Sequence, residues 1–495
     1  MERNWTISPL STLSSLRMNA MLARRLMATT AKPSFTSKPV STVLSDILIV
    51  GAGPAGLTLA SAIKNSPILQ DLKCTLVESS RITEEMNDYL EHPPKYYSNR
   101  CVSITPATID YLKKIGTWNF IKEERIQNYD YIRTYDGISG AAMDFEAPNM
   151  GTLIENYNLQ AAAYKRVLQL NEQLPESKLI IKDGNKVTRI MTDSETGYPV
   201  VKLANDERIK TRLLIGCDGG RSPVRKFARI PSRGWAYNRW GVVGTLKYKD
   251  TGFRSPTGWQ RFLPTGPLAQ LPMPNNYLSI VWSVPPELAM IVSGLTNNQF
   301  VLMLNAASRL TQDELEVLYK LAMDKPEVFE KEAKWRLDLF NAKLTVESEQ
   351  QYPQEIESIV PNSRGRFPLK LSHADDYVDE RVALVGDAAH TTHPLAGQGL
   401  NMGQADVQCL VKTLETASER GLDYGTKFAL DPYFSNRYPV NNAMLGVVDK
   451  IHKIYGTDFS PVVCARSLGV NILNNLPFVK DLMVGQVSHR ELEKK

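Results

Sequence analysis

The 495-residue sequence predicts a mixed α/β fold with a parallel-sheet domain, an antiparallel-sheet domain and a helical C-terminal segment. Two observations predict the first domain: short apolar runs end in Gly or Asp, and glycine-rich turns lead directly into helices. A third observation predicts the second domain, because residues 235–284 change to short runs rich in aromatic and β-branched residues between Pro and Gly turns.

The first 45 residues are set apart by their charge. They contain six basic residues against Glu2 alone, so the rest of the chain has 52 basic and 52 acidic residues. Their Ser- and Thr-rich composition is typical of a mitochondrial transit peptide, with a disordered basic tail as the alternative. The neutral remainder argues against nucleic-acid binding. Because no apolar run approaches the ~20 residues of a membrane-spanning helix, we expect a soluble or peripheral protein.

The fold is predicted to begin at Asp46 with a βαβ unit. An apolar strand runs into the sequence GAGPAG at 51–56, a helix follows, and a second strand ends in Glu78. Gly51, Gly53 and Gly56 allow a tight turn and the close approach of a pyrophosphate, which the helix N-terminus attracts. Glu78 can accept a hydrogen bond from a ribose hydroxyl. The spacing therefore predicts a Rossmann-like site for a nucleotide with an unphosphorylated ribose, as in FAD or NAD.

Two later segments repeat the pattern of a buried strand followed by a small residue and Asp. Residues 212–216 lead into Asp218-Gly219, which predicts a second cofactor contact although lone Asp-Gly pairs usually mark turns. Residues 382–385 lead into Gly386-Asp387, and a loop through Pro394 reaches a predicted helix start at Gly399. Asp387 is placed to accept from a sugar hydroxyl, and the helix start offers free N–H groups. An ordinary strand-loop-helix connection is the alternative.

The remaining segments complete the domain assignment. Residues 129–136 and 141–146 are expected to form a hairpin, residues 150–169 a strand and a helix, and residues 311–342 a helical excursion. The apolar pattern of 460–485 predicts a segment that packs on its own protein or faces a membrane or partner. We assign the domains by residue number as follows: 46–125, 150–228 and 366–450 to the cofactor domain, 126–149 and 229–365 to a substrate domain with a helical insertion at about 305–354, and 451–495 to the C-terminal helical segment.

The three motifs, in this order, resemble those of the class A flavoprotein monooxygenases of the hydroxybenzoate-hydroxylase type. They are GAGPAG with Glu78, CDGGRS at 217–222, and GDAAHTTHPLAGQGLNMG at 386–403. The segments WQRFLPTGPLAQLPMP at 259–274 and RGRFPLKLSHAD at 364–375 narrow the resemblance to the mitochondrial flavin-dependent monooxygenases of ubiquinone (coenzyme Q) biosynthesis. The resemblance runs from about Asp46 to near the C-terminus. The long segment at 311–354 is absent from compact bacterial relatives.

The resemblance implies FAD as the cofactor and assigns residues to it. The glycines of the first motif line the pyrophosphate, and Glu78 holds the adenosine ribose. Asp218 and Gly219 lie between FAD and a reductant. Arg100 either lies near the flavin or is a surface charge. The implied cofactor-binding residues are Gly51, Gly53, Pro54, Ala55, Gly56, Glu78, Arg100, Asp218, Gly219, Gly386, Asp387, Pro394, Gly399, Leu400 and Asn401.

The implied reaction is the insertion of one atom of O₂, through a flavin hydroperoxide, at ring C5 of a polyprenylated 4-hydroxybenzoate-type intermediate. Because the flavin supplies this chemistry, no catalytic side chain is expected. No metal site is expected either, because His390 and His393 lack further ligands at a suitable spacing.

The resemblance also implies partners and a location. By resemblance to the mitochondrial relatives, electrons are expected from a ferredoxin and its reductase. The sequence has no second nucleotide-binding βαβ unit, but this does not exclude a pyridine nucleotide, because the family has no separate domain for one. Other ubiquinone-biosynthesis proteins are expected in a complex on the matrix side of the mitochondrial inner membrane, with this chain peripheral. Five scattered cysteines agree with a reducing compartment. Two alternatives stay open: a flavin-dependent reductase or dehydrogenase of a lipid-tailed substrate, and a non-catalytic flavoprotein subunit of a biosynthetic complex.

Overall fold

The computed structural model describes residues 42–252, 254–393 and 397–474. These residues belong to one compact unit that begins at Thr42. The predicted transit peptide therefore lies, up to residue 41, outside the described residues. The predicted start of the fold at Asp46 is four residues late, because Thr42–Ser45 already pair in parallel register with residues 208–211.

Sheet A carries the parallel strands that the sequence predicts. In the described part of the chain its central strands run parallel in the order β17-β9-β1-β2-β6, while β7, β8 and β16 join antiparallel. Its strands are β1 (Thr42–Val50), β2 (Cys74–Val77), β6 (Ile180–Lys182), β7 (Val187–Thr192), β8 (Pro199–Leu203), β9 (Arg208–Gly216), β16 (Val378–Asp379) and β17 (Val382–Leu384).

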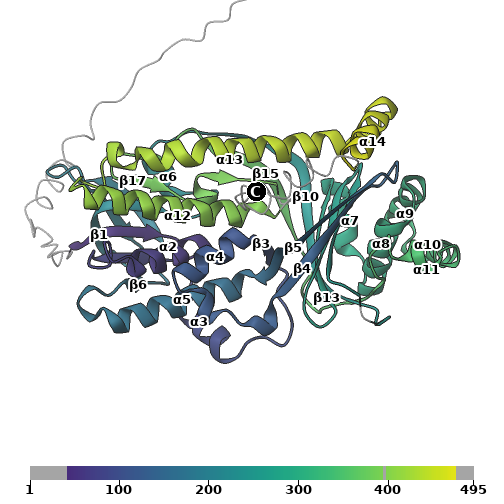
Figure 1. The fold of residues 1–495 in the computed structure, drawn as a ribbon, viewed down its shortest axis with the longest axis horizontal. Coiled ribbons are helices and arrows are strands. Elements are labelled where there is room, and N and C mark those ends of the chain that lie inside the picture. Colours follow the sequence, from purple (N-terminus) through teal and green to yellow (C-terminus); the bar gives the residue numbers. More distant parts are fainter. Residues whose placement is uncertain (1–41, 253, 394–396, 475–495) are drawn as a thin grey trace, which may run out of the picture. The chain divides into compact units, whose positions relative to one another are not determined.

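Helices pack around sheet A, as expected for parallel strands that are buried on both faces. Ile47, Leu48 and Ile49 of β1 have no exposed surface. Within this layer α2 contacts α5 and α12, and α12 contacts α13 (Figure 1). The helices are α2 (Pro54–Asn65), α3 (Ile82–Glu91), α4 (Pro106–Lys114), α5 (Asn156–Gln173), α6 (Pro223–Phe227), α12 (Gln398–Glu419) and α13 (Lys427–Tyr455).

Sheet B is the predicted antiparallel sheet, with one exception. Its described strands pair antiparallel except β4 and β11, which pair in parallel. The strands are β3 (Cys101–Ile104), β4 (Gln127–Asp136), β5 (Ala142–Glu155), β10 (Ser232–Tyr248), β11 (Thr257–Leu263), β12 (Gly266–Pro272), β13 (Tyr277–Val284), β14 (Ile356–Ile359), β15 (Gly365–Ala374) and β18 (His390–Thr391). A mixed α/β fold with two sheets is thus confirmed. The division into domains stays a prediction, because β3, β15 and β18 of this sheet come from segments assigned to the cofactor domain.

One face of sheet B packs against a helical layer. Phe300 and Trp282 lie at the centre of this contact and have no exposed surface. The helices are α7 (Pro286–Gly294), α8 (Asn297–Arg309), α9 (Gln312–Asp324), α10 (Pro326–Ala342) and α11 (Val346–Glu349). The helical excursion therefore begins before residue 305, and its long predicted helix breaks at Pro326.

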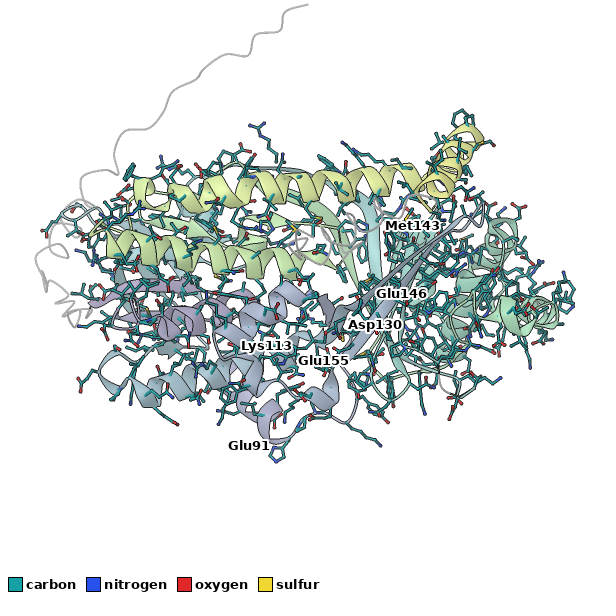
Figure 2. All side chains as sticks on the ribbon, in the orientation of Figure 1. Glu91, Lys113, Asp130, Met143, Glu146 and Glu155 are labelled. Atoms are coloured by element: carbon teal, nitrogen blue, oxygen red, sulfur yellow. The ribbon has the colours of Figure 1, made fainter. Side chains whose placement is uncertain are left out.

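The predicted hairpin at 129–146 is longer than expected. β5 continues to Glu155, so the strand predicted from Met150 is its outer end, and that end pairs with β3. A register shift between Tyr129 and Tyr131 allows β4 to follow β5 along this length. At the other end of the hairpin α14 (Ser460–Asn474) packs on β5, and Arg466 forms a buried ion pair with Asp136 at 2.7 Å. Figure 2 shows Met143 of β5 close to α14.

A buried ion pair joins the end of β5 to the segment before β4. Glu155, labelled in Figure 2, has no exposed side-chain surface and accepts from Arg125 Nε at 2.7 Å and Nη2 at 3.0 Å. We expect Arg125→Met to lower the free energy of unfolding by about 3–5 kcal/mol, because it leaves a buried carboxylate without its cation. Urea denaturation measures this. The double variant Arg125→Met/Glu155→Leu should recover most of the loss, and a single-variant cost within the error of the measurement would contradict the prediction.

Candidate functional site

The first motif forms a turn that requires glycine at two positions. Gly51 follows β1 with φ +102°, and a Cβ placed on it would lie 2.3 Å from the carbonyl oxygen of Cys217. A Cβ on Gly56 would lie 1.9 Å from the oxygen of Gly51. Gly53 differs, since a Cβ there meets nothing within 4 Å. Pro54 then begins α2, so unpaired N–H groups and open space lie together, which suits a pyrophosphate.

Glu78 lies at the end of β2 and faces the same turn. Its Oε2 accepts from the Ala52 amide at 2.7 Å, and its Oε1 accepts from the amides of Ser79 (2.7 Å) and Ser80 (2.9 Å). Burial alone would raise the pKa of Glu78, but these hydrogen bonds outweigh it and lower the pKa. Glu78 is therefore an ionised acceptor next to the glycine turn.

Asp218 and Gly219 lie at the end of β9, against the first motif. Cys217 donates its amide to Val50 at 2.8 Å, which joins the two strand ends. Asp218 accepts from the Val224 amide through Oδ2 (3.1 Å), while its Oδ1 is buried without a partner among the described residues. Burial raises the pKa of Asp218. Gly219 has φ +79°, and a Cβ placed on it would meet nothing within 4 Å, so an acceptor and an open backbone lie side by side.

The third motif brings α2 and α12 together at Gly386. With φ +60°, Gly386 lies where a Cβ would be 3.7 Å from both Ala55 Cβ and Gly403 Cα. The next residue, Asp387, is exposed to solvent, yet desolvation raises its pKa against the opposing charges of His390 and Lys370. The Asp387 carboxyl group therefore faces open space on one side and protein on the others.

The start of α12 is held by Asn401, which is buried. Its Oδ1 accepts from the Thr105 amide (3.0 Å) and Thr108 Oγ1 (2.9 Å), and its Nδ2 donates to the Ser103 carbonyl at 2.9 Å. These three hydrogen bonds of the Asn401 side chain therefore hold the start of α12 against the turn between β3 and α4. Leu400 is half-buried, and Gly399 lies where a Cβ would be 3.5 Å from Thr392.

The described contacts do not test two of the predicted site residues. Pro394 lies outside the described residues. Arg100 is exposed at the start of β3, and its guanidinium makes no hydrogen bond or ion pair within residues 42–252, 254–393 and 397–474. The remaining predicted residues come from the carboxyl ends of β1, β2, β9 and β17 and from the helices that follow, which is the edge where parallel sheets bind ligands.

Sequence reasoning missed a buried network behind this edge. Asp406 of α12 has no exposed surface, and its Oδ2 lies 2.6 Å from His390 Nε2 and accepts from the Gly386 amide at 3.2 Å. Its Oδ1 accepts from Arg437 Nε (2.8 Å) and Asn441 Nδ2 (3.1 Å) of α13. Burial would raise the pKa of Asp406, but His390 and Arg437 hold it at about 2. The sequence did contain one signal of this network: Asp406 is an acidic residue next to the apolar face of a predicted helix.

A second cluster lies on sheet B, next to the loop that contains Pro394. A register shift in β10 between Ala236 and Trp240, with Asn238 at φ +50°, accompanies a ring cluster of Tyr237, His393 and His452 with centroids 4.7–5.1 Å apart. Burial, the neighbouring histidine and Arg239 lower the pKa of His393 to about 3. Burial, Arg239 and Lys453 likewise lower the pKa of His452, against the opposing charge of Asp449. Both imidazoles are therefore neutral hydrogen-bonding groups at physiological pH.

Comparison with known proteins identifies the class of this protein. The FAD binding domain family matches residues 45–289 and 319–446. Among solved structures, p-nitrophenol 4-monooxygenase PnpA from Pseudomonas putida has a TM-score of 0.62 at 15% identity and covers 91% of this chain and 100% of its own. PqsL, a probable FAD-dependent monooxygenase from Pseudomonas aeruginosa, has a TM-score of 0.58 at 18% identity, covering 85% and 99%. The protein is an FAD-dependent monooxygenase of the class A flavoprotein hydroxylases, as the sequence predicts.

Curated relatives narrow the class to one family. The chain is 44% identical over 95% of its length to the mitochondrial ubiquinone biosynthesis monooxygenase COQ6 of Saccharomyces cerevisiae, and covers 98% of that protein. It is 37% identical to the Schizosaccharomyces pombe protein of the same name and 32% identical to the Mus musculus one, over 92% and 95% of this chain and 94% and 96% of theirs. The chain belongs to the COQ6 family of ubiquinone biosynthesis monooxygenases.

The open space at Gly53 predicts a variant that loses FAD without losing its fold. In Gly53→Val the side chain has room in the protein but occupies the space that a pyrophosphate needs, so we expect FAD affinity to fall by at least about a hundredfold. Flavin absorbance after gel filtration measures this. Gly446→Val, also in open space but on α13, serves as the control. Equal flavin content in the two variants would contradict the prediction.

The Asp406 network predicts a pH-dependent stability. Because the folded-state pKa of Asp406 is about 2 and its ordinary value is 3.8, its contribution is present above pH 4 and is lost as the pH falls toward 2. We expect Asp406→Asn to lower the free energy of unfolding by about 2–5 kcal/mol at neutral pH, with a difference that shrinks below pH 4. Urea unfolding at several pH values measures both. The exposed Asp458→Asn is the control, and a pH-independent difference would contradict the assignment.

Proposed function

We propose that this protein hydroxylates ring carbon C5 of a polyprenylated 4-hydroxybenzoate-type intermediate. The observation that carries this proposal is the short connection between the two sheets. Leu384 ends β17 in sheet A, Gly386 and Asp387 follow, and His390 begins β18 in sheet B. A flavin held at the carboxyl edge of sheet A would therefore face sheet B, so a flat aromatic ring would fit between them.

The chain's residues fit FAD at this edge. We assign the pyrophosphate to Gly51, Gly53 and the N-terminus of α2, and the adenosine ribose to Glu78. The unpartnered Asp218 Oδ1 and the accessible Asp387 carboxyl supply acceptors for hydroxyl or ring N–H groups. When bound, FAD supplies the activation of O₂ and the transfer of one oxygen atom to the ring.

The polar cluster on sheet B gives the substrate ring an orientation. Tyr237 can hydrogen-bond a phenolic hydroxyl, and the neighbouring His393 adds no positive charge there, because both side chains are neutral at physiological pH. Arg239 has no ion-pair partner within the described residues, so it is available to an anionic substituent of the ring. These contacts would leave the ring carbon between them and the flavin.

The reaction consumes one O₂, two electrons and two protons for each oxygen atom inserted, and it releases one water. We infer that the electrons come from a ferredoxin and its reductase, and that the protein works as a peripheral member of a complex on the matrix side of the mitochondrial inner membrane. The COQ6 relatives are mitochondrial by name. Among the described residues, none of the helices combines the length and hydropathy that a membrane crossing needs.

Isotope labelling tests the proposal. The FAD-loaded protein is supplied with a prenylated 4-hydroxybenzoate, a ferredoxin/ferredoxin-reductase couple and ¹⁸O₂, and the product is analysed by mass spectrometry and NMR. We expect one ¹⁸O atom per ring, at C5. Asp387→Ala should lose product together with flavin. Reoxidation of the flavin with an unchanged ring would contradict hydroxylation and favour a reductase or a non-catalytic subunit.

A further inference from the structure

The outer face of α13 exposes an apolar stripe. Val440, Val447 and Ile454 lie seven residues apart and so share one face of the helix. Their exposed fractions are 47%, 52% and 45%, which is high for aliphatic residues on a helix that packs on a sheet and another helix. Figure 1 shows α13 along the upper edge of the ribbon, with α14 following it.

The stripe continues after α13. Phe459, Leu468 and Ile472 are 62%, 59% and 51% exposed, and the last two are four residues apart on α14. We call these six residues, Val440, Val447, Ile454, Phe459, Leu468 and Ile472, the α13–α14 apolar surface. An open depression of about 480 Å³ beside α14 has apolar walls from Val463 and Leu468 and polar walls that include Ser467. Because α13 and α14 are in contact, these exposed apolar residues lie on neighbouring helices, and such a group marks an interaction site.

Basic and aromatic residues border this surface. Lys450 is exposed on the same face as Val447 and Ile454, and Lys453 lies 4.9 Å from the ring of the half-exposed Trp235. Of the acids in this part of α13 and the following turn, Asp449 is buried and paired with Lys453, whereas Asp458 is exposed. Lysines with an aromatic ring at the edge of an apolar face are typical of helices that lie in a membrane interface.

The inner face of the same helical turns covers the candidate site. His452 contacts Tyr237, Tyr455 stacks on Phe262 at 4.1 Å, and Val448 packs beside Phe262. The site and the apolar surface are therefore separated by little more than one helix, which is about 10 Å across. A lipid that reached the outer face of α13 would be about 10 Å from the ring cluster.

We propose that the α13–α14 apolar surface docks on a membrane that contains anionic phospholipid. The apolar residues enter the boundary between headgroups and acyl chains, and Lys450 and Lys453 contact the lipid phosphates. This inference rests on the proposed function, because a polyprenylated substrate must pass from the bilayer to the site. The position of α13 then makes that passage short.

Flotation with lipid vesicles tests the docking surface. The full-length, FAD-loaded protein is mixed with vesicles of phosphatidylcholine, with or without phosphatidylglycerol. We expect binding to the mixed vesicles to fall by about tenfold in Val447→Asp/Ile454→Asp and again in Leu468→Asp/Ile472→Asp. Lys450→Gln should weaken binding to the anionic vesicles by about fivefold and leave binding to phosphatidylcholine unchanged.

A matched control lies on another part of the molecule. Met323 on α9 and Val346 on α11 are 60% and 78% exposed, so Met323→Asp/Val346→Asp makes the same chemical change outside the proposed surface. This variant should float like the wild type. Circular dichroism and flavin content confirm that each variant is folded. A folded wild type that does not float, or stripe variants that float like the control, would overturn the proposal. Loss of a wild-type dimer in the stripe variants, without any vesicle binding, would instead assign the surface to a second copy of the chain.

A second substrate separates this proposal from the proposed function. A short-tailed, water-soluble prenylated 4-hydroxybenzoate needs no membrane, so the stripe variants should hydroxylate it at the wild-type rate. The same variants should lose at least about tenfold in rate on a long-tailed substrate embedded in vesicles. Failure of the wild type on the soluble substrate would count against the hydroxylase, whereas equal rates for wild type and variants on the embedded substrate would count against docking.

Discussion

Backbone segments at the carboxyl edge of sheet A approach one another more closely than side chains permit. Gly51 lies against the carbonyl of Cys217, and Gly56 lies against the carbonyl of Gly51, whereas Gly386 is at ordinary contact distance from Ala55 and Gly403. This crowding brings three motifs from distant parts of the sequence to a single edge. A larger residue at Gly51 or Gly56 would move β9 or α2, so these glycines are needed for the assembly of the edge. Gly53 differs, because a Cβ there would meet nothing within 4 Å, and this open space is where we propose that the pyrophosphate binds.

The edge also depends on one buried carboxylate. Asp406 is the acceptor for the Gly386 amide, for His390 at the start of β18 and for Arg437 on α13. It therefore fixes the third motif relative to sheet B and to the helix that covers it. An apolar residue would fill the same volume but could not orient the Gly386 amide, so a satisfied polar network determines the geometry that packing alone would leave free.

The parts of this structure that sequence reasoning predicted are those encoded locally. A strand, a glycine turn, a helix and an acidic residue within about 30 residues determine the βαβ unit. The segments Asp218-Gly219 after β9 and Gly386-Asp387 after β17 were predicted from the same pattern of a buried strand followed by Gly and Asp. The parts that it missed depend on partners far along the chain. The parallel pairing of β4 with β11, the extension of β5 to β3, and the contacts of Asp406 with Arg437 have no local signal. Asn401 illustrates the intermediate case: its position at the start of α12 was predicted, but its commitment to the β3–α4 turn required the structure.

The helical period explains how α13 can serve two surfaces. Within one stretch of two turns, Val448, His452 and Tyr455 point to sheet B, while Val447, Lys450 and Ile454 point outward. A helix that only covered the site would be expected to have a polar outer face, because exposed aliphatic residues add nothing to folding and favour aggregation. Half-exposed aliphatic residues at three positions of one face, seven residues apart, therefore indicate a binding surface. The same helix carries His452 of the ring cluster, and its Arg437 contacts Asp406 behind the third motif. The exposed apolar face and the contacts to the candidate site therefore belong to one helix.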